Sequence, residues 1–503
     1  MLASVATFAI EGVDSVEVAV EVDARRGLPA FTIVGLPGAA VREARERVRA
    51  AILNSGLDFP LKRLSANLAP ADLRKSGPSF DLALAVAVLA ASGQVPACEL
   101  SSYAVCGELS LSGALRPVRG ALALALGARR AGRRRLILPA ENASEAALVE
   151  GIDVLGVERL ELIAALLRGE WRPETPRAGP AVEPSHEPAL DLSEVRGQTD
   201  AKRALEIAAA GGHHLLMVGP PGVGKTMLAR RVAGILPPPS FEEALEITRV
   251  HSVAGLSHGE LASERPFRSP HHTISTSGLV GGGSTPRPGE ITLAHRGVLF
   301  LDELAEFSRG ALEALRQPLE VGRIEVTRGQ RSLSFPAQAM LIGACNTCPC
   351  ARPPDDCTCN DVDRARYARR LSAPLLDRID LVCELGRAPA PGGRAIADAS
   401  LDVARRVSAA REMQRARLEG TGSLSNAEMS ARLTQLHAPP DAHGRRRLDH
   451  GRGDAALTGR GQDRALRVAR TIADLEGHER VEAAHVEEAI GFRLASIGQT
   501  AAA

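Results

Sequence analysis

The sequence predicts an α/β protein of several domains: a mixed α and β domain at the N-terminus, a central P-loop domain with a parallel sheet, and a helical C-terminal domain. Three observations predict this order. A glycine-rich phosphate-binding pattern lies between a strand pattern and a helix pattern, a proline-rich segment precedes it, and a charged, helix-periodic region follows it. Since 503 residues are too many for one hydrophobic core, roughly two to four domains are expected.

The first 170 residues mix strand and helix patterns. The alternating stretches VEVAVEVDA and AFTIVGLPG predict strands, and AAVREARERVRAAILNSG predicts an amphipathic helix that Gly56 ends. Residues 171–190 contain five prolines and almost no apolar periodicity, which predicts a semi-rigid linker. The N-terminal domain is therefore expected to span residues 1–170.

The composition limits how the chain could bind nucleic acid. Aromatic residues make up 3% of the sequence, which argues against base stacking as the main binding mode, and the net charge of +1 provides no general attraction for an anion. Local arginine clusters at residues 129–135 and 364–370 remain, but taken alone each is better interpreted as a solvated helix face.

Neither hydrophobic stretch near the N-terminus has the pattern of a targeting or membrane segment. The first residues lack a basic leader, and the apolar run FDLALAVAVLAASG contains Asp81 and is too short to cross a bilayer. A cytoplasmic protein without a membrane partner is expected.

The stretch GPPGVGKT at residues 219–226 matches the P-loop pattern in its required context between a strand and a helix. Its glycines let backbone N–H groups surround phosphate oxygens, and the following helix adds its dipole. Lys225 is expected to reach the β- and γ-phosphates, and the Thr226 hydroxyl to bind Mg²⁺. The predicted ATP-binding residues are Gly219, Pro220, Pro221, Gly222, Val223, Gly224, Lys225 and Thr226.

Two further strand ends supply polar residues that suit hydrolysis. In GVLFLDE, Asp302 is expected to hold the Mg²⁺ shell and Glu303 to act as general base on the attacking water. Asn346 follows the strand AMLIGACN and could orient that water. Taken alone, the two acids could be an ordinary strand end; beside a P-loop they predict an ATPase.

Phosphoryl transfer also needs positive charge on the transferring group, often from a neighbouring subunit. Arg378 in PLLDRIDL and Arg460 in LTGRGQDRALRVART are the candidates, with Arg464 and Arg467 as alternatives. Surface salt bridges are the competing interpretation of these arginines.

Together these motifs resemble the AAA+ ATPases of the magnesium-chelatase-like branch, of the ComM/YifB type. The resemblance rests on GPPGVGKTMLARR, RPFRSPHHTISTSGLVGGG, GVLFLDELAEF, CNTCPC, SAPLLDRIDL and RALRVARTIADLEG, and it runs along almost the whole chain. It implies a homo-hexameric ring with ATP between subunits. It also implies that Asn346 is sensor 1, Arg378 an arginine finger acting in trans and Arg460 sensor 2.

The resemblance also divides the rest of the chain. It implies an ATPase domain over residues 191–388, with a helix-2 insert at 265–291 and a pre-sensor hairpin at 320–336, followed by a helical lid over 389–503. Arg328 and Arg331 at the hairpin tip suit sequence-independent phosphate contacts with DNA, although an exposed charged turn would have the same composition. Residues 443–457 are rich in Arg, Gly and His and poorly periodic, so an altered path into Arg460 is expected.

The N-terminal domain resembles the protease domain of Lon through SGPSFDLALAVAVL and CGELSLSGALRPVRGALALALGARRAG. Cleavage of that type needs a serine and a lysine base. Ser79 occupies the serine position, but Leu122 occupies the lysine position, and neither Lys75 nor Lys62 replaces it. No peptidase activity is expected, and the domain is expected to serve ring assembly or the binding of DNA or a partner.

The resemblance implies an ATP-driven DNA motor that promotes branch migration of recombination intermediates during natural transformation. Its implied partners are branched and single- or double-stranded DNA and a recombinase. Two alternatives remain, the motor subunit of a metal chelatase and an AAA+ regulator that remodels a protein partner. DNA-stimulated ATPase activity would distinguish the first function from the other two.

Five of the eight cysteines lie between residues 345 and 360. Cys348, Cys350, Cys357 and Cys359 form two C-x-C pairs, whose four thiolates could close a tetrahedral Zn²⁺ site; free thiols are the alternative. Disulfides are disfavoured in a reducing compartment. Four thiolates leave no open coordination position, so a structural zinc is predicted. The other cysteines (Cys98, Cys106, Cys345 and Cys383) are expected to be buried.

Overall fold

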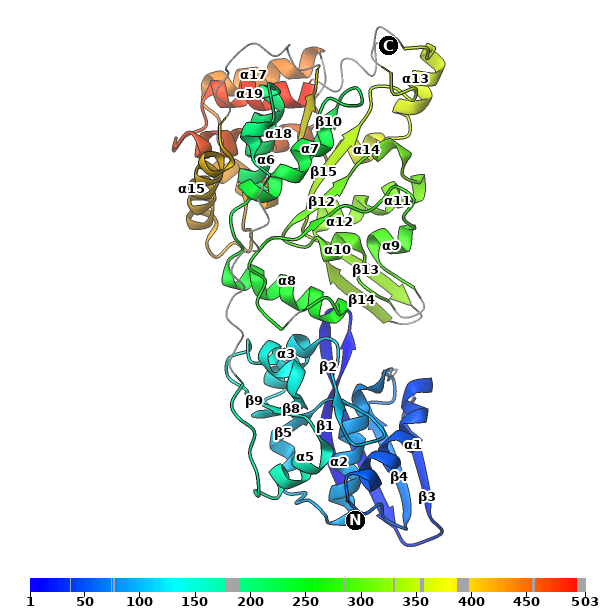
Figure 1. The fold of residues 1–503 in the computed structure, drawn as a ribbon. Helices are drawn as coiled ribbons and strands as arrows, with labels where there is room; N and C mark the ends of the chain where they lie inside the picture. The colour runs from blue at the N-terminus through cyan, green and yellow to red at the C-terminus, as the bar shows by residue number, and fades with distance from the viewer. Residues whose placement is uncertain are drawn as a thin grey trace. The chain divides into compact units, whose positions relative to one another are not determined.

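The computed structural model describes residues 1–36, 38–73, 75, 77–176, 190–257, 259–283, 286–328, 331–352, 357–386, 398–454 and 457–494 (Figure 1). The chain separates into two compact units. Unit 1 comprises Met1–Glu183, Phe241–Ser263 and Thr327–Ser334; unit 2 comprises Pro184–Ser240, Glu264–Val326 and Phe335–Ala503. The chain is thus an α/β protein of more than one unit, as the sequence predicts.

Unit 1 is built on a seven-stranded sheet of order β3-β4-β2-β1-β5-β8-β9. Strands β1 and β4 run antiparallel to β2, and the other neighbours are parallel. The strands are β1 (Leu2–Glu11), β2 (Asp14–Arg25), β3 (Ala30–Val34), β4 (Arg63–Ala69), β5 (Tyr103–Val105), β8 (Arg135–Pro139) and β9 (Asp153–Val157), with a separate small pair, β6 (Glu108–Leu109) and β7 (Leu115–Arg116).

The helices of unit 1 are α1 (Ala39–Asn54), α2 (Asp81–Ser92), α3 (Ala121–Arg130), α4 (Ala143–Ala146), α5 (Leu160–Leu167) and α8 (Phe241–Ala254). Helix α2 is the apolar run FDLALAVAVLAASG, and it is buried on every side. An all-round hydrophobic helix of this length belongs in a protein core. Its one charged residue, Asp81, is fully buried and accepts two hydrogen bonds from Arg47, at 2.8 and 3.0 Å.

Helix α8 follows the P-loop region in sequence but belongs to unit 1 by its contacts. It packs against α3, and Leu245 joins the apolar cluster around that helix. The Ser252 carbonyl accepts a hydrogen bond from Gly120 N–H at 3.1 Å, and its hydroxyl donates to the buried carboxylate of Glu145. Sequence patterns around the P-loop do not indicate this assignment.

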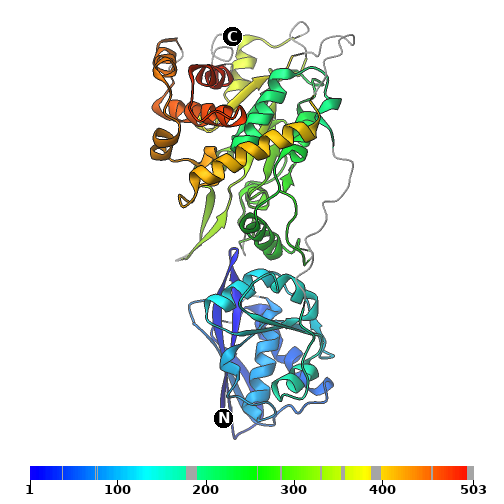
Figure 2. The ribbon, with the colours of Figure 1, turned by 90° about the vertical axis from the view of Figure 1, so that its left-hand side faces the viewer.

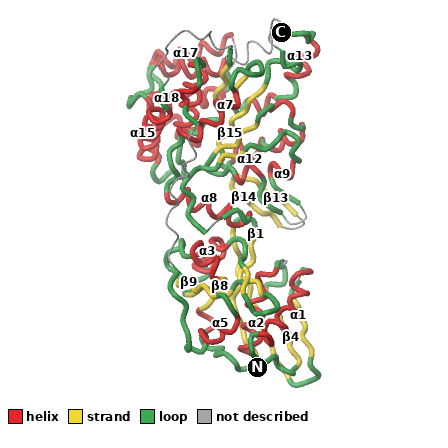
Figure 3. The backbone as a smooth tube through the Cα atoms, viewed as in Figure 1, coloured by secondary structure: helices red, strands yellow, loops and turns green. Residues whose placement is uncertain are grey.

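Unit 2 contains a five-stranded, fully parallel sheet of order β11-β12-β15-β10-β16. The strands are β10 (Leu215–Val218), β11 (Phe267–Arg268), β12 (Val298–Leu301), β15 (Met340–Cys345) and β16 (Leu381–Glu384). The helices before the lid are α6 (Thr199–Gly211), α7 (Lys225–Arg231), α9 (Thr276–Val280), α10 (Glu290–Leu293), α11 (Arg309–Ala314), α12 (Arg316–Val321), α13 (Asp361–Ala368) and α14 (Ala373–Leu376). Helices separate most of these strands along the chain, as parallel strands require, and Figure 3 shows the strands of unit 2 among its helices.

The predicted β-patterned arms form a two-stranded sheet, β13 (Arg323–Arg328) and β14 (Arg331–Pro336). Arg328 ends β13 and Arg331 begins β14, so both border the turn of the hairpin. Their side chains lie outside the described part of the chain.

The C-terminal helices are α15 (Ser400–Leu418), α16 (Ala431–His437), α17 (Ala442–Asp454), α18 (Gly459–Leu475) and α19 (Ala483–Leu494). The long helix α15 packs against α6 (Figure 2). Helix α17 runs through most of the poorly periodic stretch 443–457, so the altered path expected there is not seen up to Asp454. Poor periodicity lowers amphipathicity, but Leu448 still reaches the core, which is enough to dock the helix.

Helix α18 is joined to the sheet by polar contacts as well as by apolar packing. Asp380, just before β16, lies 3.6 Å from Arg464 and accepts a hydrogen bond from the backbone N–H of His214 at 2.9 Å. His213 bonds the Thr471 hydroxyl at 2.8 Å. In the described ranges, no helix is long and apolar enough to span a membrane.

Candidate nucleotide-binding and hydrolysis site

The predicted catalytic residues come from three neighbouring strands of unit 2. In the order β12-β15-β10, the first strand leads into Asp302 and Glu303, the second into Asn346, and the third into the P-loop. The carboxyl ends of parallel strands meet at one edge of a sheet, which is where open α/β sheets bind ligands. The topology therefore brings together residues that are more than 120 positions apart in sequence.

The P-loop turn depends on its glycines. A Cβ atom at Gly219 would lie 2.6 Å from the Leu385 carbonyl oxygen, a distance that no side chain tolerates. Gly224 has a φ of 97°, in the left-handed region that favours glycine, and it directly precedes Lys225 at the start of α7. The loop thus presents its backbone and the helix N-terminus to an anion.

Lys225 is the buried cation of the site. Its ammonium donates to the carbonyl oxygens of Gly219 (2.6 Å) and Pro220 (2.9 Å) and to Oδ1 of Asn346 (3.1 Å). Burial lowers the pKa of this ammonium, and the nearby carboxylates of Asp302 and Glu303 act in the opposite direction. Phosphate oxygens would give the ammonium a charged partner that its two carbonyl acceptors do not supply.

The residues predicted to hold Mg²⁺ are in contact with each other. The Thr226 hydroxyl donates to Oδ2 of Asp302 at 2.7 Å. A hydroxyl and a carboxylate fit a hard cation that also takes phosphate oxygens and water. The donor set therefore suits Mg²⁺ bound together with a nucleotide.

Glu303 has an unusual backbone and a specific side-chain partner. Its φ of 51° and ψ of 46° place it in the left-handed region, and its N–H donates to Oδ1 of Asp302 at 2.9 Å. Oε2 of Glu303 lies 3.2 Å from Nδ1 of His272, in the segment between β11 and α9. A non-glycine residue held in this region is often found at a functional site. His272 lies in the RPFRSPHHTISTSGLVGGG motif, whose sequence pattern does not predict this contact.

Arg378 and Arg460 share one acidic partner. Arg378 forms an ion pair with Glu320 and donates to the carbonyl oxygens of Arg316 (2.9 Å) and Pro374 (2.6 Å). Arg460, in the first turn of α18, is 70% exposed and lies 3.7 Å from the same Glu320. The sequence does not predict a role for Glu320, because a lone acid on a short helix belongs to no motif.

The alternative arginines both have partners within unit 2. Arg464 pairs with Asp380, and Arg467 donates to the Ala427 carbonyl oxygen at 2.6 Å, where burial lowers the pKa of its guanidinium. The first contact joins α18 to the residue just before β16, and the second joins α18 to the 3-10 helix η8 (Asn426–Glu428).

The four cysteines of the two C-x-C pairs gather around a common centre. Their Sγ atoms all lie within 4.8 Å of one another, with separations of 3.2, 3.6 and 3.7 Å among Cys348, Cys350 and Cys357. A Zn–S bond of about 2.3 Å in a tetrahedron gives sulfur separations of about 3.8 Å. The cluster therefore fits the predicted structural zinc site.

Two observations concern the surroundings of the cysteines. A backbone N–H at Cys359, followed by the Arg364 guanidinium 3.5 Å away, lowers the pKa of the Cys357 thiol. Cys106, Cys345 and Cys383 are buried as expected, but Cys98 is exposed. The expectation for Cys98 is wrong because the residue lies in the turn after α2, beyond the core that the helix fills.

Comparison with known proteins agrees with this geometry. The family "magnesium chelatase, subunit ChlI" matches residues 191–391, its C-terminal family matches 397–493, and "subunit ChlI of Mg-chelatase" matches 20–142. The competence protein ComM of Haemophilus influenzae is 41% identical over 505 residues, covering 98% of this chain and 97% of ComM. The chain belongs to the ComM/YifB-type magnesium-chelatase-like family.

Other full-length relatives give the same result. YifB of Salmonella typhimurium is 44% identical over 498 residues, covering 98% of this chain and 97% of YifB. An uncharacterised protein of Mycobacterium tuberculosis, Rv2897c, is 46% identical over 497 residues, covering 96% and 97% of the two chains. Membership of this family supports an ATPase that uses ATP and Mg²⁺.

A second, regional similarity concerns Lon proteases. Lon protease 2 of Bacillus subtilis is 28% identical over 186 residues, about a third of either chain. In this ComM/YifB-type chain Ser79 is half-buried in the short helix η1 (Pro78–Phe80), and Leu122 is fully buried in α3. Lys75 is also fully buried and donates to the Pro70 carbonyl oxygen, whereas Lys62 is exposed.

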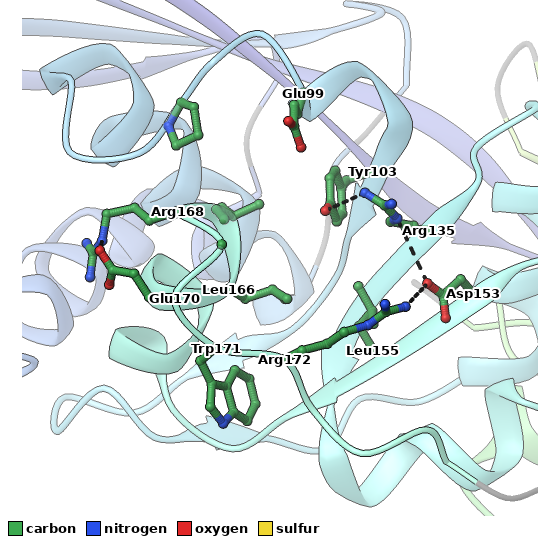
Figure 4. Close-up of a pocket in the computed structure, with 13 residues that line it drawn as sticks. Glu99, Tyr103, Arg135, Asp153, Leu155, Leu166, Arg168, Glu170, Trp171 and Arg172 are labelled. Carbon is green, nitrogen blue, oxygen red and sulfur yellow. Dashed lines mark hydrogen bonds and ion pairs between the residues drawn. The ribbon is translucent and has the colours of Figure 1, made fainter.

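Unit 1 also contains a cavity of about 520 Å³ at the start of strands β5, β8 and β9 (Figure 4). Several of its charged groups are paired: Arg172 lies 3.2 Å and Arg135 3.9 Å from Asp153, and Arg168 lies 2.8 Å from Glu170. Arg135 also donates to the Tyr103 hydroxyl at 2.8 Å, and Trp171 and Leu166 add apolar surface to the lining.

Proposed function

We propose that the protein is an ATP-driven, homo-hexameric DNA motor that promotes branch migration of recombination intermediates, as in natural transformation. The observation that carries the proposal is the convergence of Lys225, Asn346 and the Thr226–Asp302 pair at one sheet edge. Support for the process comes from a full-length relative named as the competence protein ComM. The protein would act in the cytoplasm, where ATP and DNA are both available.

In the proposed reaction, the P-loop backbone and Lys225 bind the β- and γ-phosphates, and Lys225 exchanges its carbonyl partners for phosphate oxygens. Thr226 and Asp302 would hold Mg²⁺, which neutralises developing charge on the phosphates. Asn346 orients the attacking water, and Glu303 accepts its proton.

In the proposed hexameric ring, Arg378 and Arg460 each have a role at a bound nucleotide. In a hexamer, Arg378 would leave Glu320 and reach the γ-phosphate bound by the adjacent subunit, while Arg460 would contact the nucleotide in its own subunit. An intrachain partner does not conflict with this role, since an ion pair at a partly exposed acid is readily exchanged. Glu320 would then hold both arginines when no nucleotide is bound.

DNA would pass along the β13–β14 hairpin, where Arg328 and Arg331 border the turn. Contacts of that kind reach phosphates and are independent of sequence, as a motor requires. A recombinase would supply the joint molecule on which the motor acts. The zinc site would stiffen the segment between Asn346 and Arg378, and unit 1 would serve assembly or binding without peptidase activity.

One alternative has specific support, because the matched families are described as magnesium chelatase subunits. ATPase measurements with and without a synthetic four-way junction separate the two functions. A DNA motor is expected to hydrolyse ATP several-fold faster with the junction, in a manner that weakens with salt. An ATPase rate that neither forked nor four-way DNA changes would contradict the DNA motor and favour the chelatase or protein-remodelling alternatives.

A further inference from the structure

The cavity of unit 1 has walls from three segments that are distant in sequence. One wall is formed by the first residues of β5, β8 and β9, which are Tyr103, Arg135 and Asp153. A second wall is the end of α5 with the residues after it, from Leu166 to Arg172. The third contains Glu99, just before the 3-10 helix η2 (Leu100–Ser102). A volume of about 520 Å³ is enough for a ligand of the size of a short peptide.

The sheet holds the residues of the first wall in a row. Tyr103 is the register partner of Arg135, and Arg135 is the register partner of Asp153. Because register partners on neighbouring strands point to the same face of a sheet, the three side chains lie beside one another. The Arg135 guanidinium lies over the Tyr103 ring, 5.2 Å from its centre, and donates to its hydroxyl at 2.8 Å. Tyr103 is buried, so this wall is anchored in the core of unit 1.

Positive charge is in excess around Asp153. Arg172 lies 3.2 Å and Arg135 3.9 Å from the same oxygen of this carboxylate, Oδ2. One carboxylate neutralises one guanidinium, and each guanidinium has more N–H donors than a single carboxylate oxygen accepts. The third arginine of the lining does not add to the excess, because Arg168 is paired with Glu170 at 2.8 Å. An anionic group of a ligand therefore suits this end of the cavity.

Glu99 supplies a negative charge at a separate place in the lining. Its carboxylate makes no hydrogen bond or ion pair with the described residues. Figure 4 shows the Glu99 side chain directed toward the cavity and apart from Arg172 and Asp153. The Ser102 hydroxyl donates to the Glu99 carbonyl oxygen at 2.9 Å, and the backbone N–H of Arg134 donates to the Ser102 carbonyl oxygen at 3.1 Å. These contacts join the Glu99 segment to the start of β8.

The uncharged part of the lining is apolar. Leu155, Leu166 and Leu167 line the cavity and are buried, and the partly buried Trp171 packs against the same core. A ligand that covers these side chains gains from the removal of apolar surface from water. The cavity thus combines an apolar surface with one cationic and one anionic end.

We propose that this cavity binds a zwitterion of the size of a short peptide, with charged ends and an apolar body. The cationic end of the ligand pairs with Glu99, its anionic end pairs with Arg172 and Arg135, and its body covers Leu166 and Trp171. A neutral apolar ligand would leave both unmatched charges of the lining without a partner, and a singly charged ligand would leave one. The proposal does not depend on the DNA motor, since these residues lie outside the nucleotide site.

The test uses the tripeptide alanyl-leucyl-alanine as the probe and the full-length protein. Trp171 is the only tryptophan of the chain and lines the cavity, so a saturable change in its fluorescence is expected, with the dissociation constant checked by calorimetry. Acetylation of the probe removes its cationic end, and amidation removes its anionic end. Each modification should weaken binding about 3- to 10-fold, the effect of one hydrogen-bonded contact.

Two substitutions assign the ends of the probe to their partners. Glu99→Gln should weaken binding of the unmodified tripeptide about 3- to 10-fold and should no longer distinguish it from the acetylated form. Arg172→Gln should lose most of its sensitivity to amidation while it keeps its sensitivity to acetylation. Arg172 is 71% exposed, so its replacement is not expected to disturb folding. Glu141→Gln, at an exposed acid of unit 1 outside the cavity, is the matched control and should behave like the wild type.

Three results would overturn the proposal. The first is the absence of both a saturable Trp171 signal and a binding heat with the tripeptide at millimolar concentration. The second is equal affinity of the wild type for the unmodified, acetylated and amidated probes, which would mean that the cavity does not recognise charge. The third is a Glu99→Gln variant that still distinguishes the acetylated probe as the wild type does. Rates of ATP hydrolysis and branch migration do not enter this test, so failure of the DNA motor would leave its result unchanged.

Discussion

The nucleotide-binding edge of unit 2 and the Lon-like region of unit 1 both contain parallel strands with helices beside them, but they differ in the residues at their strand and helix ends. In unit 2 the strand ends carry a lysine, two acids and an amide that contact one another or lie side by side. In unit 1 the position expected for a lysine base is Leu122, which is fully buried. A fold of this kind thus supports catalysis only where a few polar residues remain at the strand and helix ends.

Among the predicted effects on ATPase activity at the nucleotide-binding edge of unit 2, the largest is expected at Arg378. Arg378→Ala should lower the ATPase kcat by about 10³-fold or more, because a finger arginine stabilises charge in the transition state. Mixed rings that combine this variant with Lys225→Ala subunits should regain activity, since each then supplies what its neighbour lacks. Arg370→Ala, a nearby surface arginine paired with Glu306, is the control. Mixed rings with no more ATPase activity than either variant alone would contradict a role of Arg378 in the adjacent subunit.

Glu303→Gln tests the base itself. The substitution keeps the shape of the side chain but removes its basicity, so kcat should fall by about 10²- to 10⁴-fold while ATP still binds. Glu306→Gln, three residues further on, should retain the wild-type rate. Full activity in Glu303→Gln, measured by phosphate release, would place the base elsewhere.

In unit 1, the Leu122 side chain is expected to contribute to the stability of the fold and not to catalysis. Leu122→Ala should reduce the free energy of unfolding of unit 1 by about 2–5 kcal/mol through the cavity it leaves. Ser79→Ala, at the serine position of the Lon-like region, should change stability by less than about 0.5 kcal/mol and leave ATPase activity intact. Casein cleavage by the wild type that Ser79→Ala abolishes would show that unit 1 is a peptidase after all.

The smallest effect on turnover is expected at the cysteine cluster. Purified protein should contain close to one zinc per chain, and Cys348→Ser or Cys357→Ser should remove it and lower the melting temperature with only a modest loss of kcat. Cys98→Ser, an exposed cysteine outside the cluster, is the matched control. Wild-type protein without zinc by elemental analysis, together with an unchanged melting temperature in the variants, would leave the four residues as free thiols.

The sequence predicts the elements of the nucleotide site because each depends on local signals. The P-loop needs glycines at fixed spacing, and Asp302, Glu303 and Asn346 each follow a continuous apolar strand. Because parallel strand ends meet at one edge, the pairing of Thr226 with Asp302 follows from the topology. The same reasoning predicts the cysteine cluster, whose spacing alone brings four thiols together.

Other features depend on contacts between segments that share no local signal. Glu320 pairs with Arg378 and Arg460, and His272 contacts Glu303, because segments that are distant in sequence fold together in unit 2. Helix α8 packs with unit 1 through single residues such as Ser252, which no periodicity singles out. Helix α17 forms despite a weak pattern because packing of a few apolar side chains outweighs intrinsic propensity.

The most direct test of the account is branch migration of a synthetic four-way junction by the wild type and by Lys225→Ala, each with ATP and Mg²⁺. The wild type is expected to convert the junction into two duplex products only when ATP is present. Lys225→Ala should still bind the junction but leave it intact, because its P-loop lacks the cation that holds the phosphates. Equal conversion by both proteins, or none by the wild type under conditions where it hydrolyses ATP, would contradict the account.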